Sequence, residues 1–198
     1  MQTRIVLAAL ALSSILTVGC SMTQGNPKEP AKNPHPVKRY EITATSHAPG
    51  SWDVIEGNVV YEVINKDCLP MDSFLGQQDV PNTGFVVAMT RVDDHTWRGY
   101  FYRDALQDED YYKLGLCRWD VTSAGISAVV AGARFNWSHT LRTLLRDGMQ
   151  TSYFKKTSYG DPATARYGAQ ALTIGDPDVS QRPDACFPVT IAVTDVAP

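Results

Sequence analysis

Residues 59–64 read VVYEVI, and this run decides the fold class. Five of its six residues are Val, Ile or Tyr, the types that fit a pleated, half-buried strand. The segment Asn65-Lys66-Asp67 follows directly and has the composition of a turn. We therefore predict a strand at 59–64 and expect partner strands on either side of it.

The sequence on both sides of this strand has the same two-residue period. The segment Asp93-Asp94-His95 has the composition of a hairpin turn, and residues 123–125, Ser-Ala-Gly, have that of a second turn. Further strands are predicted at 40–45, 85–90, 97–102, 114–121, 126–135, 151–155 and 187–193. Short strands at this spacing indicate an all-β fold, an antiparallel two-sheet β-sandwich.

One segment departs from the two-residue period. Leu141, Leu144 and Leu145 recur at helical spacing, and Ser138 before them is a residue type that caps helices. We therefore expect the sandwich to include one short helix at this place in the chain.

The amino terminus has the parts of a bacterial export signal. Arg4 supplies a positive charge, residues 5–18 form an apolar run too short to span a bilayer comfortably, and Gly19-Cys20-Ser21 ends it. Small residues before a cysteine resemble the lipobox of bacterial lipoproteins. The resemblance implies that the preceding segment is removed and that Cys20 carries three acyl chains, a permanent anchor. The alternative is an ordinary secretory signal with an incidental Cys20, because Thr17 stands where Leu is commoner.

The chain is therefore expected to have three parts: a signal peptide at 1–19, a lipidated cysteine with a Pro-rich tether at 20–37, and a β-sandwich domain at 38–198. Four prolines and almost no large apolar residue predict that the tether is an extended spacer. Ser21, directly after the anchor, resembles the residue that permits transfer of lipoproteins to the outer membrane. This implies a lipid-anchored protein of the outer membrane that faces the periplasm.

Three cysteines remain after the anchor, Cys68, Cys117 and Cys186. In an oxidising compartment an odd number leaves one cysteine unpaired. We favour a disulfide between Cys68 and Cys117, since the first follows one predicted strand and the second lies within another. Pairings that use Cys186 stay open on these grounds, and the alternative for Cys186 is a small buried apolar residue.

The sequence contains no recognisable pattern for catalysis, metal binding or nucleic-acid binding. The formal net charge is −3, which does not favour a basic nucleic-acid-binding face. No cysteine pair has the close spacing of zinc ligands, and no Gly-x-Ser-x-Gly elbow or Gly-rich phosphate loop occurs. We therefore expect a protein that is not an enzyme, binds no metal or other cofactor, and has no nucleic-acid partner.

The densest acidic patch consists of Asp104, Asp108, Glu109 and Asp110, followed by two tyrosines. One interpretation is a calcium site or an anionic contact surface, but the spacing is not that of an EF-hand loop. We favour the other interpretation, a solvated loop whose tyrosines begin the next strand.

The four tryptophans allow two interpretations, a ligand groove or a sandwich core. Trp97 and Trp119 are assigned to the core because aromatic residues at alternating strand positions usually fill it. Trp52 and Trp137 are left open between the two interpretations.

Residues 106–119, LQDEDYYKLGLCRW, resemble a stretch of small proteobacterial lipoproteins that are often encoded beside toxins of contact-dependent (type VI or type IV) secretion systems. Two further features are similar to that family. These are an Asn-x-Asp-Cys-x-Pro at 65–70 and a Tyr-Phe before two lysines at 153–156. The likeness covers most of residues 58–193. It also supports the pairing of Cys68 with Cys117, because both lie in the shared segments, and it implies that these segments are scaffold rather than interface.

This resemblance implies a periplasmic immunity protein. Such a protein binds and neutralises a secreted effector toxin, here expected to be a phospholipase or a cell-wall hydrolase, with its lipid anchor in the membrane. Two alternatives of other classes stay open. One is a structural or assembly lipoprotein of the envelope, and the other is a lipoprotein that binds a small ligand or calcium.

Overall fold

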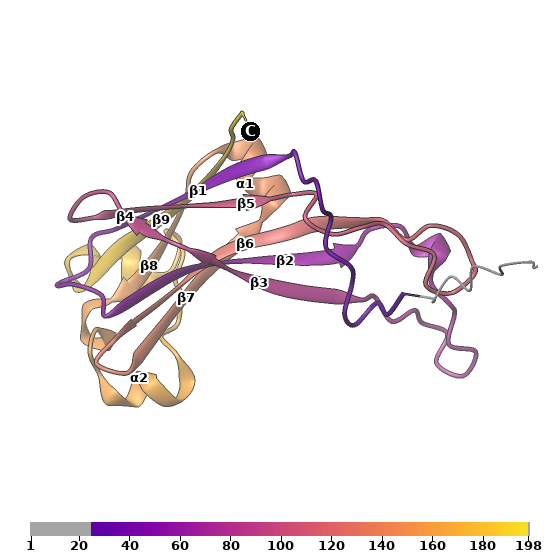
Figure 1. Cartoon of the computed structure of the whole chain (residues 1–198). Coiled ribbons are helices and arrows are strands. Elements are labelled where there is room, and N and C mark those ends of the chain that lie inside the picture. Colours follow the sequence, from indigo (N-terminus) through magenta and orange to yellow (C-terminus); the bar gives the residue numbers. More distant parts are fainter. Residues whose placement is uncertain (1–24, 198) are drawn as a thin grey trace, which may run out of the picture.

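Two antiparallel sheets packed face to face form the body of the protein in a computed structural model that describes residues 25–197 (Figure 1). The prediction of an all-β, two-sheet sandwich with a short helix is confirmed. The predicted signal peptide at 1–19, the anchor at Cys20 and the sorting residue Ser21 lie outside the described residues.

The strands of each sheet do not follow the chain order. The first sheet consists, in spatial order, of β4 (Thr90–Arg91), β5 (Thr96–Tyr102), β1 (Arg39–Ser46), β9 (Cys186–Asp195) and β8 (Gln150–Lys155). The second sheet consists of β3 (Asn82–Ala88), β2 (Val54–Val63), β6 (Trp119–Val130) and β7 (Ala133–Thr140). Every pairing between these strands is antiparallel.

The core lies between the two sheets because each strand buries alternate residues. In β1 this alternation places Ile42 and Ala44 fully inside, and in β9 it does the same for Ile191. Burying one such large aliphatic side chain contributes about 1.5–3 kcal/mol. The aromatic rings of Phe135, from β7, and Phe154, from β8, meet edge to face in the core at 5.0 Å between centroids.

Tyr61, in the middle of the fold-deciding run, joins the two sheets. Its ring is buried in the core, and its hydroxyl donates a hydrogen bond to the backbone carbonyl of Tyr102, at the end of β5. Burial raises the pKa of the Tyr61 phenol well above its ordinary value, so the hydroxyl keeps its proton and stays a donor.

The two strands predicted at 114–121 and 126–135 are wrong in their bounds. A single strand, β6, runs straight through residues 123–125, and the turn falls later, at Ala131-Gly132, both with positive φ. Gly125 is a glycine for another reason. A Cβ on it would lie 2.6 Å from Cβ of Ser138 and 2.8 Å from Oδ1 of Asn58, so its neighbours, and not a turn, exclude a side chain.

The expected short helix is α1 (Leu141–Asp147), which buries Leu141 and Leu144. The predicted cap is wrong: Ser138 belongs to β7, and the side chain of Thr140 accepts a hydrogen bond from the backbone N–H of Thr143 instead. Two more helices, α2 (Pro162–Tyr167) and α3 (Pro177–Ser180), were not expected. Over residues 25–197, no helix has the length and apolar character needed to cross a membrane.

Short 3₁₀ turns complete the described chain, at Lys66–Cys68, Lys156–Ser158 and Pro183–Ala185. Trp97 and Trp119 are buried as predicted, each 8% exposed, and Trp137, which the sequence left open, is also buried. Trp52 is half-buried against the core, with its ring edge-on to that of Phe135.

The described part of the predicted tether, residues 25–37, includes a turn in which the N–H of Glu29 donates to the carbonyl of Asn26 at 2.9 Å, and it does not stand free of the domain. The backbone N–H of Asn33 donates to the carbonyl of Ala105 at 2.8 Å, and Gln107 N–H donates to the carbonyl of Ala31 at 2.9 Å. A proline-rich chain cannot form a continuous ladder of backbone hydrogen bonds, because proline has no N–H group. Its remaining N–H and C=O groups can still form hydrogen bonds. The segment therefore runs along the domain as a strap rather than as a spacer.

Candidate functional site

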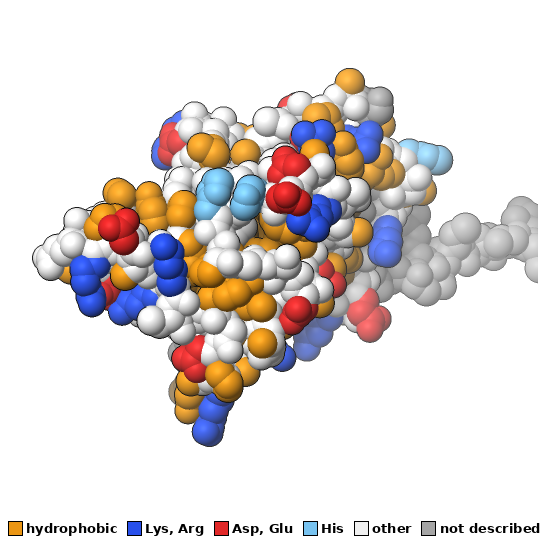
Figure 2. Space-filling view, turned by 90° about the vertical axis from the view of Figure 1, so that its left-hand side faces the viewer, with side chains coloured by type: hydrophobic (Ala, Val, Ile, Leu, Met, Phe, Trp, Pro, Cys, Tyr) orange, Lys and Arg blue, Asp and Glu red, His pale blue; other side chains and the backbone are white. Residues whose placement is uncertain are grey.

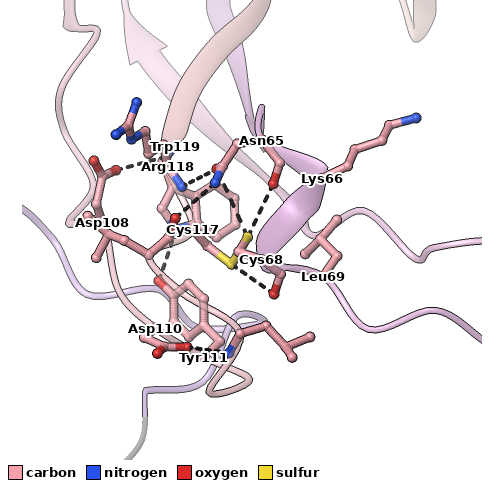
Figure 3. Close-up of a disulfide and its surroundings, with 12 residues drawn as sticks. Asn65, Lys66, Cys68, Leu69, Asp108, Asp110, Tyr111, Cys117, Arg118 and Trp119 are labelled. Carbon is pink, nitrogen blue, oxygen red and sulfur yellow. Dashed lines mark hydrogen bonds between the residues drawn. A yellow bond between two sulfur atoms is a disulfide. The ribbon is translucent and has the colours of Figure 1, made fainter.

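The predicted disulfide between Cys68 and Cys117 is present, with the two Cα atoms 5.3 Å apart (Figure 3). Cys68 ends the 3₁₀ turn after β2, and Cys117 stands two residues before β6, so the bond ties together the loops that leave two neighbouring strands. Closing a loop of 49 residues contributes about 4 kcal/mol in the chain-entropy model. Cys186 is free and buried, the alternative considered for it.

Asn65 reinforces the same junction from its side chain. Its Nδ2 donates to the carbonyl of Leu116 at 2.9 Å, and its Oδ1 accepts from the backbone N–H of Arg118 at 2.7 Å (Figure 3). These two bonds lie on either side of Cys117 in the sequence and resemble one rung of a sheet. The disulfide and these two side-chain hydrogen bonds thus hold the ends of β2 and β6 together.

The acidic patch predicted as a loop is a loop, and most of its carboxylates support the backbone. Asp108 Oδ1 accepts from the N–H of Trp119 at 2.9 Å, and Asp110 Oδ1 accepts from the N–H of Leu114 at 3.2 Å. Asp104 accepts from Val37 N–H at 3.0 Å and Lys38 N–H at 2.9 Å. This engagement favours the loop interpretation over a calcium site, and residues 25–197 contain no group of three or more His, Cys, Asp or Glu arranged to hold a metal ion.

The pKa of Asp104 reflects two opposing effects. Burial alone would raise the pKa of this carboxyl, but the hydrogen bonds from the Val37 and Lys38 N–H groups outweigh it and lower the pKa below its ordinary value. The charged form of Asp104 therefore fastens the strap to the domain.

The tyrosines after the acidic patch do not begin a strand, contrary to the prediction. Tyr111 is buried, and its hydroxyl accepts a hydrogen bond from Nε1 of Trp119 at 2.9 Å. Burial raises the pKa of the Tyr111 phenol. The ring of Tyr111 therefore anchors the loop to the core beside the disulfide.

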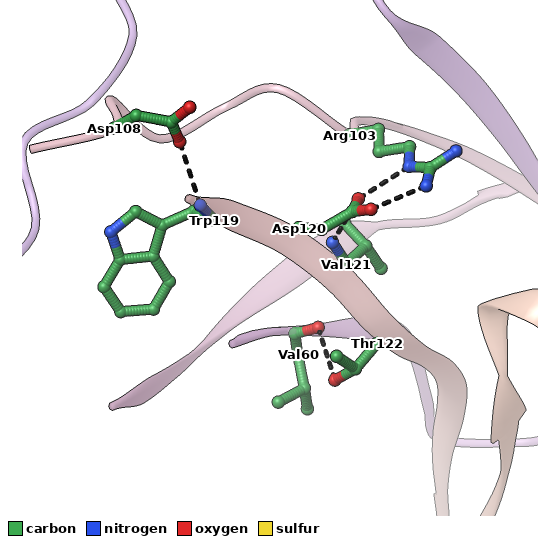
Figure 4. A network of polar contacts seen from close by, with 7 residues as sticks. All are labelled: Val60, Arg103, Asp108, Trp119, Asp120, Val121 and Thr122. Atoms are coloured by element: carbon green, nitrogen blue, oxygen red, sulfur yellow. Dashed lines mark hydrogen bonds and ion pairs between the residues drawn. The ribbon is translucent and has the colours of Figure 1, made fainter. Parts of the chain in front are cut away.

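Arg103 and Asp120 form a two-point ion pair between the two sheets (Figure 4). The Nε and Nη2 atoms of Arg103 each lie 2.6 Å from one oxygen of Asp120, and the same carboxylate accepts from the N–H of Val121 at 2.8 Å. The hydrogen bonds that Arg103 donates to the Asp120 carboxylate raise the pKa of the Arg103 guanidinium. The pair links the end of β5, in one sheet, to β6, in the other.

This ion pair separates two neighbouring surface cavities of about 590 Å³ and 740 Å³. Both cavities are lined by Ile64, Arg103 and Asp120, so we treat them as one groove. We call it the arginine groove, and its basic residues are Lys38, Arg103, Arg118, Arg142 and Arg146.

The arginine groove has an excess of positive charge in a chain whose formal net charge is −3. Its three acidic residues, Asp104, Asp108 and Asp120, already accept hydrogen bonds from the protein itself. Arg118 and Arg142 are exposed, and within residues 25–197 neither forms an ion pair. The groove thus presents basic groups that are available to a partner.

Apolar surface lies among these charges. Ile64 is 55% exposed between the two cavities, and Leu145, on α1, is 40% exposed. Protein–protein interfaces combine apolar surface with arginine side chains, which are enriched there. The arrangement can therefore bind an acidic surface, whereas it contains no nucleophile–base pair.

The arginine groove has no recognisable signature in the sequence. Its basic residues come from the position directly after the strap, the end of β5, the loop before β6 and α1, which only the sheet topology brings together. The one local signal was the spacing of Arg142 and Arg146, four residues apart and hence on one face of a helix.

Comparison with known proteins gives no match: no family model, no curated protein and no solved structure matches the chain. Any functional conclusion therefore depends on the geometry of the groove and the pattern of the sequence.

Proposed function

We propose that this protein is a periplasmic immunity lipoprotein of the outer membrane, anchored through Cys20, which binds and neutralises a secreted antibacterial effector. The observation that carries the proposal is the arginine groove, a concave basic surface with exposed Ile64 and Leu145 on a disulfide-held scaffold. An inhibitor needs a rigid surface of this kind, because ordering a flexible one on binding costs free energy.

The chemistry of the groove favours an acidic face on the partner. An arginine binds a carboxylate through two parallel hydrogen bonds, and Arg118 and Arg142 have exposed guanidinium groups. Hydrolases that cleave wall glycans work with a pair of Asp or Glu side chains in an open cleft. A basic groove that closes over the mouth of such a cleft both pairs its acidic side chains and excludes the substrate.

The second candidate is an assembly lipoprotein of the envelope, which one observation favours. β3, of sequence NTGFVVA, is an edge strand of the four-stranded sheet, and it has no charged residue and no proline to block further pairing. Such an edge can accept a strand from another protein. Recovery of a structural envelope protein on this edge would favour the second candidate.

A capture experiment tests the first candidate. The lipidated chain, immobilised through its anchor on lipid-coated beads, is challenged with lysate of the native organism grown under conditions that express its secretion systems. We expect one enzyme in stoichiometric amount, inhibited when it is bound. Capture of no enzyme, or of an enzyme whose activity is unchanged in the complex, would contradict the proposal.

A charge-reversed variant locates the interface in the same experiment. Replacing Arg118 and Arg142 together (Arg118→Glu, Arg142→Glu) is expected to abolish capture. Arg134→Glu is the matched control, because this arginine is also exposed but lies on β7, outside the groove.

A further inference from the structure

Two loops at the disulfide end carry large apolar side chains into solvent. In the loop after Cys68, Phe74 is 94% exposed, with Met71 and Leu75 each 60% exposed. In the loop before Cys117, Leu114 is 52% and Leu116 is 50% exposed. Soluble surfaces rarely gather residues of this kind at one place without a binding role.

An aspartate fixes the conformation of each loop, so the apolar side chains at the tips are held in an exposed position. Asp72 Oδ1 accepts from the N–H groups of Phe74 and Leu75, both at 2.8 Å. Asp110 Oδ1 accepts from the N–H of Leu114 at 3.2 Å in the other loop. Aspartate commonly fixes turns in this way, by bonding to N–H groups that follow it.

The disulfide joins the bases of the two loops. Cys68 precedes Met71 by three residues, and Cys117 follows Leu116 directly. Both loops project from the same end of the sandwich, on the right of Figure 1. The opposite end looks different, since apolar, charged and histidine side chains are interspersed there (Figure 2).

The described chain begins at this same end. Gly25 lies against the side chains of Glu109 and Tyr111, so closely that a Cβ on it would overlap the Glu109 carboxylate. Cys20 is only five residues before Gly25, a distance that extended chain spans in about 17 Å at most. Because the strap uses the rest of the Pro-rich segment, a membrane that holds Cys20 lies next to the two apolar loops.

We propose that Met71, Phe74 and Leu75, together with Leu114 and Leu116, insert into the lipid interface of the membrane that carries the anchor. The inference rests on the lipidation of Cys20, which belongs to the proposed function. The surrounding charges have both signs, with Lys66 and Lys113 near Asp67, Asp72 and Asp110. Apolar contact rather than attraction to anionic lipid therefore drives the insertion, and salt affects it little.

Spin labelling measures the depth of the tip directly. The lipidated full-length protein carrying Phe74→Cys is labelled with a nitroxide and reconstituted into vesicles of phosphatidylethanolamine and phosphatidylglycerol. Tyr167→Cys is the matched control, because Tyr167 is 81% exposed on α2. The unsubstituted protein gives the background from the buried Cys186.

We expect the label at position 74 to be shielded several-fold from a water-soluble nickel complex, and to be more accessible to oxygen than the label at position 167. Leu75→Cys should give the same result, and neither substitution disturbs the core because both side chains are exposed. Equal access of nickel to both labels, with the protein still floating with the vesicles, would overturn the inference but not the anchor. Shielding that occurs only after an effector is added would overturn it in favour of a protein contact. Failure to float with the vesicles would overturn the anchor and the inference together.

Discussion

Arg103 and Asp120 face each other across the two sheets, with Nε and Nη2 of the guanidinium each 2.6 Å from a carboxylate oxygen. The Arg103 side chain is 36% exposed and the Asp120 side chain 20%. The pair thus lies where the core meets the arginine groove, and it both joins the sheets and divides the groove. The contribution of this ion pair to the stability of the fold can be measured separately from its part in binding a partner.

Removing either partner of this pair should destabilise the fold. We expect Arg103→Ala or Asp120→Ala to lower the free energy of unfolding by about 1–2 kcal/mol, because each leaves a half-buried charge without its partner. The double variant should cost less than the sum of the two, measured by urea unfolding. Strict additivity would mean that the two side chains do not stabilise each other.

The disulfide should contribute more than any other single feature of the loops. Cys68→Ala with Cys117→Ala is expected to lower the free energy of unfolding by about 4 kcal/mol, and a reducing agent should do the same to the natural protein. The Cys186→Ala variant is the control, and reduction should lower its free energy of unfolding by the same amount. If reduction leaves the melting temperature of the natural protein in place, the bond does not stabilise the fold.

Two strand glycines provide a matched pair of substitutions. Gly125→Ala should cost about 1–3 kcal/mol, because the added methyl would lie 2.6 Å from Cβ of Ser138. At Gly84, in β3, the nearest atom is 3.8 Å from the same methyl, so Gly84→Ala should be neutral or slightly stabilising. Denaturant midpoints measure both, and an equal loss in the two variants would contradict the packing argument.

The strap should detach in acid. The pKa of Asp104 is lower in the folded protein than its ordinary value of about 3.8. The stability that the charged carboxylate contributes is therefore complete above about pH 3.8, and it is lost as the pH falls through the folded-state pKa. We expect the amide signals of Val37 and Lys38 in NMR spectra to keep their hydrogen-bonded positions at neutral pH and to shift below about pH 4. Asp104→Ala should show the shifted positions at every pH. Signals that do not change in acid would mean that other contacts hold the strap.

The alternation of buried and exposed residues made the sandwich predictable from the sequence, whereas several local details were not. The burial of every second residue in β1 and β9 follows directly from the sequence period. The turn at Ala131-Gly132 was missed because alanine rarely adopts a positive φ, while Ser123-Ala124-Gly125 has the composition of a turn without being one. Composition predicted an extended Pro-rich tether, but it could not show that the N–H groups of this segment would pair with Asp104 and Ala105.

The arginine groove could not be predicted from the sequence for a different reason. Lys38 and Arg142 are more than a hundred residues apart, and only the order of strands in the two sheets brings their elements to one end of the sandwich. The disulfide could be predicted because Cys68 and Cys117 each adjoin a strand of one sheet, where pairing sets the distance between them.

Contact-dependent competition tests the central claim most directly. A strain of the native organism that lacks this protein is grown on a surface with its parent, and is complemented with the natural protein, with Arg118→Glu/Arg142→Glu, or with Arg134→Glu. We predict that the deletion strain is killed only in contact with the parent, and that the natural protein and the Arg134→Glu variant restore survival. The doubly reversed groove should fail to protect while reaching the same cellular level, since charge reversal at two contacts costs about 2 kcal/mol or more of binding free energy at each. Equal survival of the deletion strain and its parent in contact would contradict the proposed function.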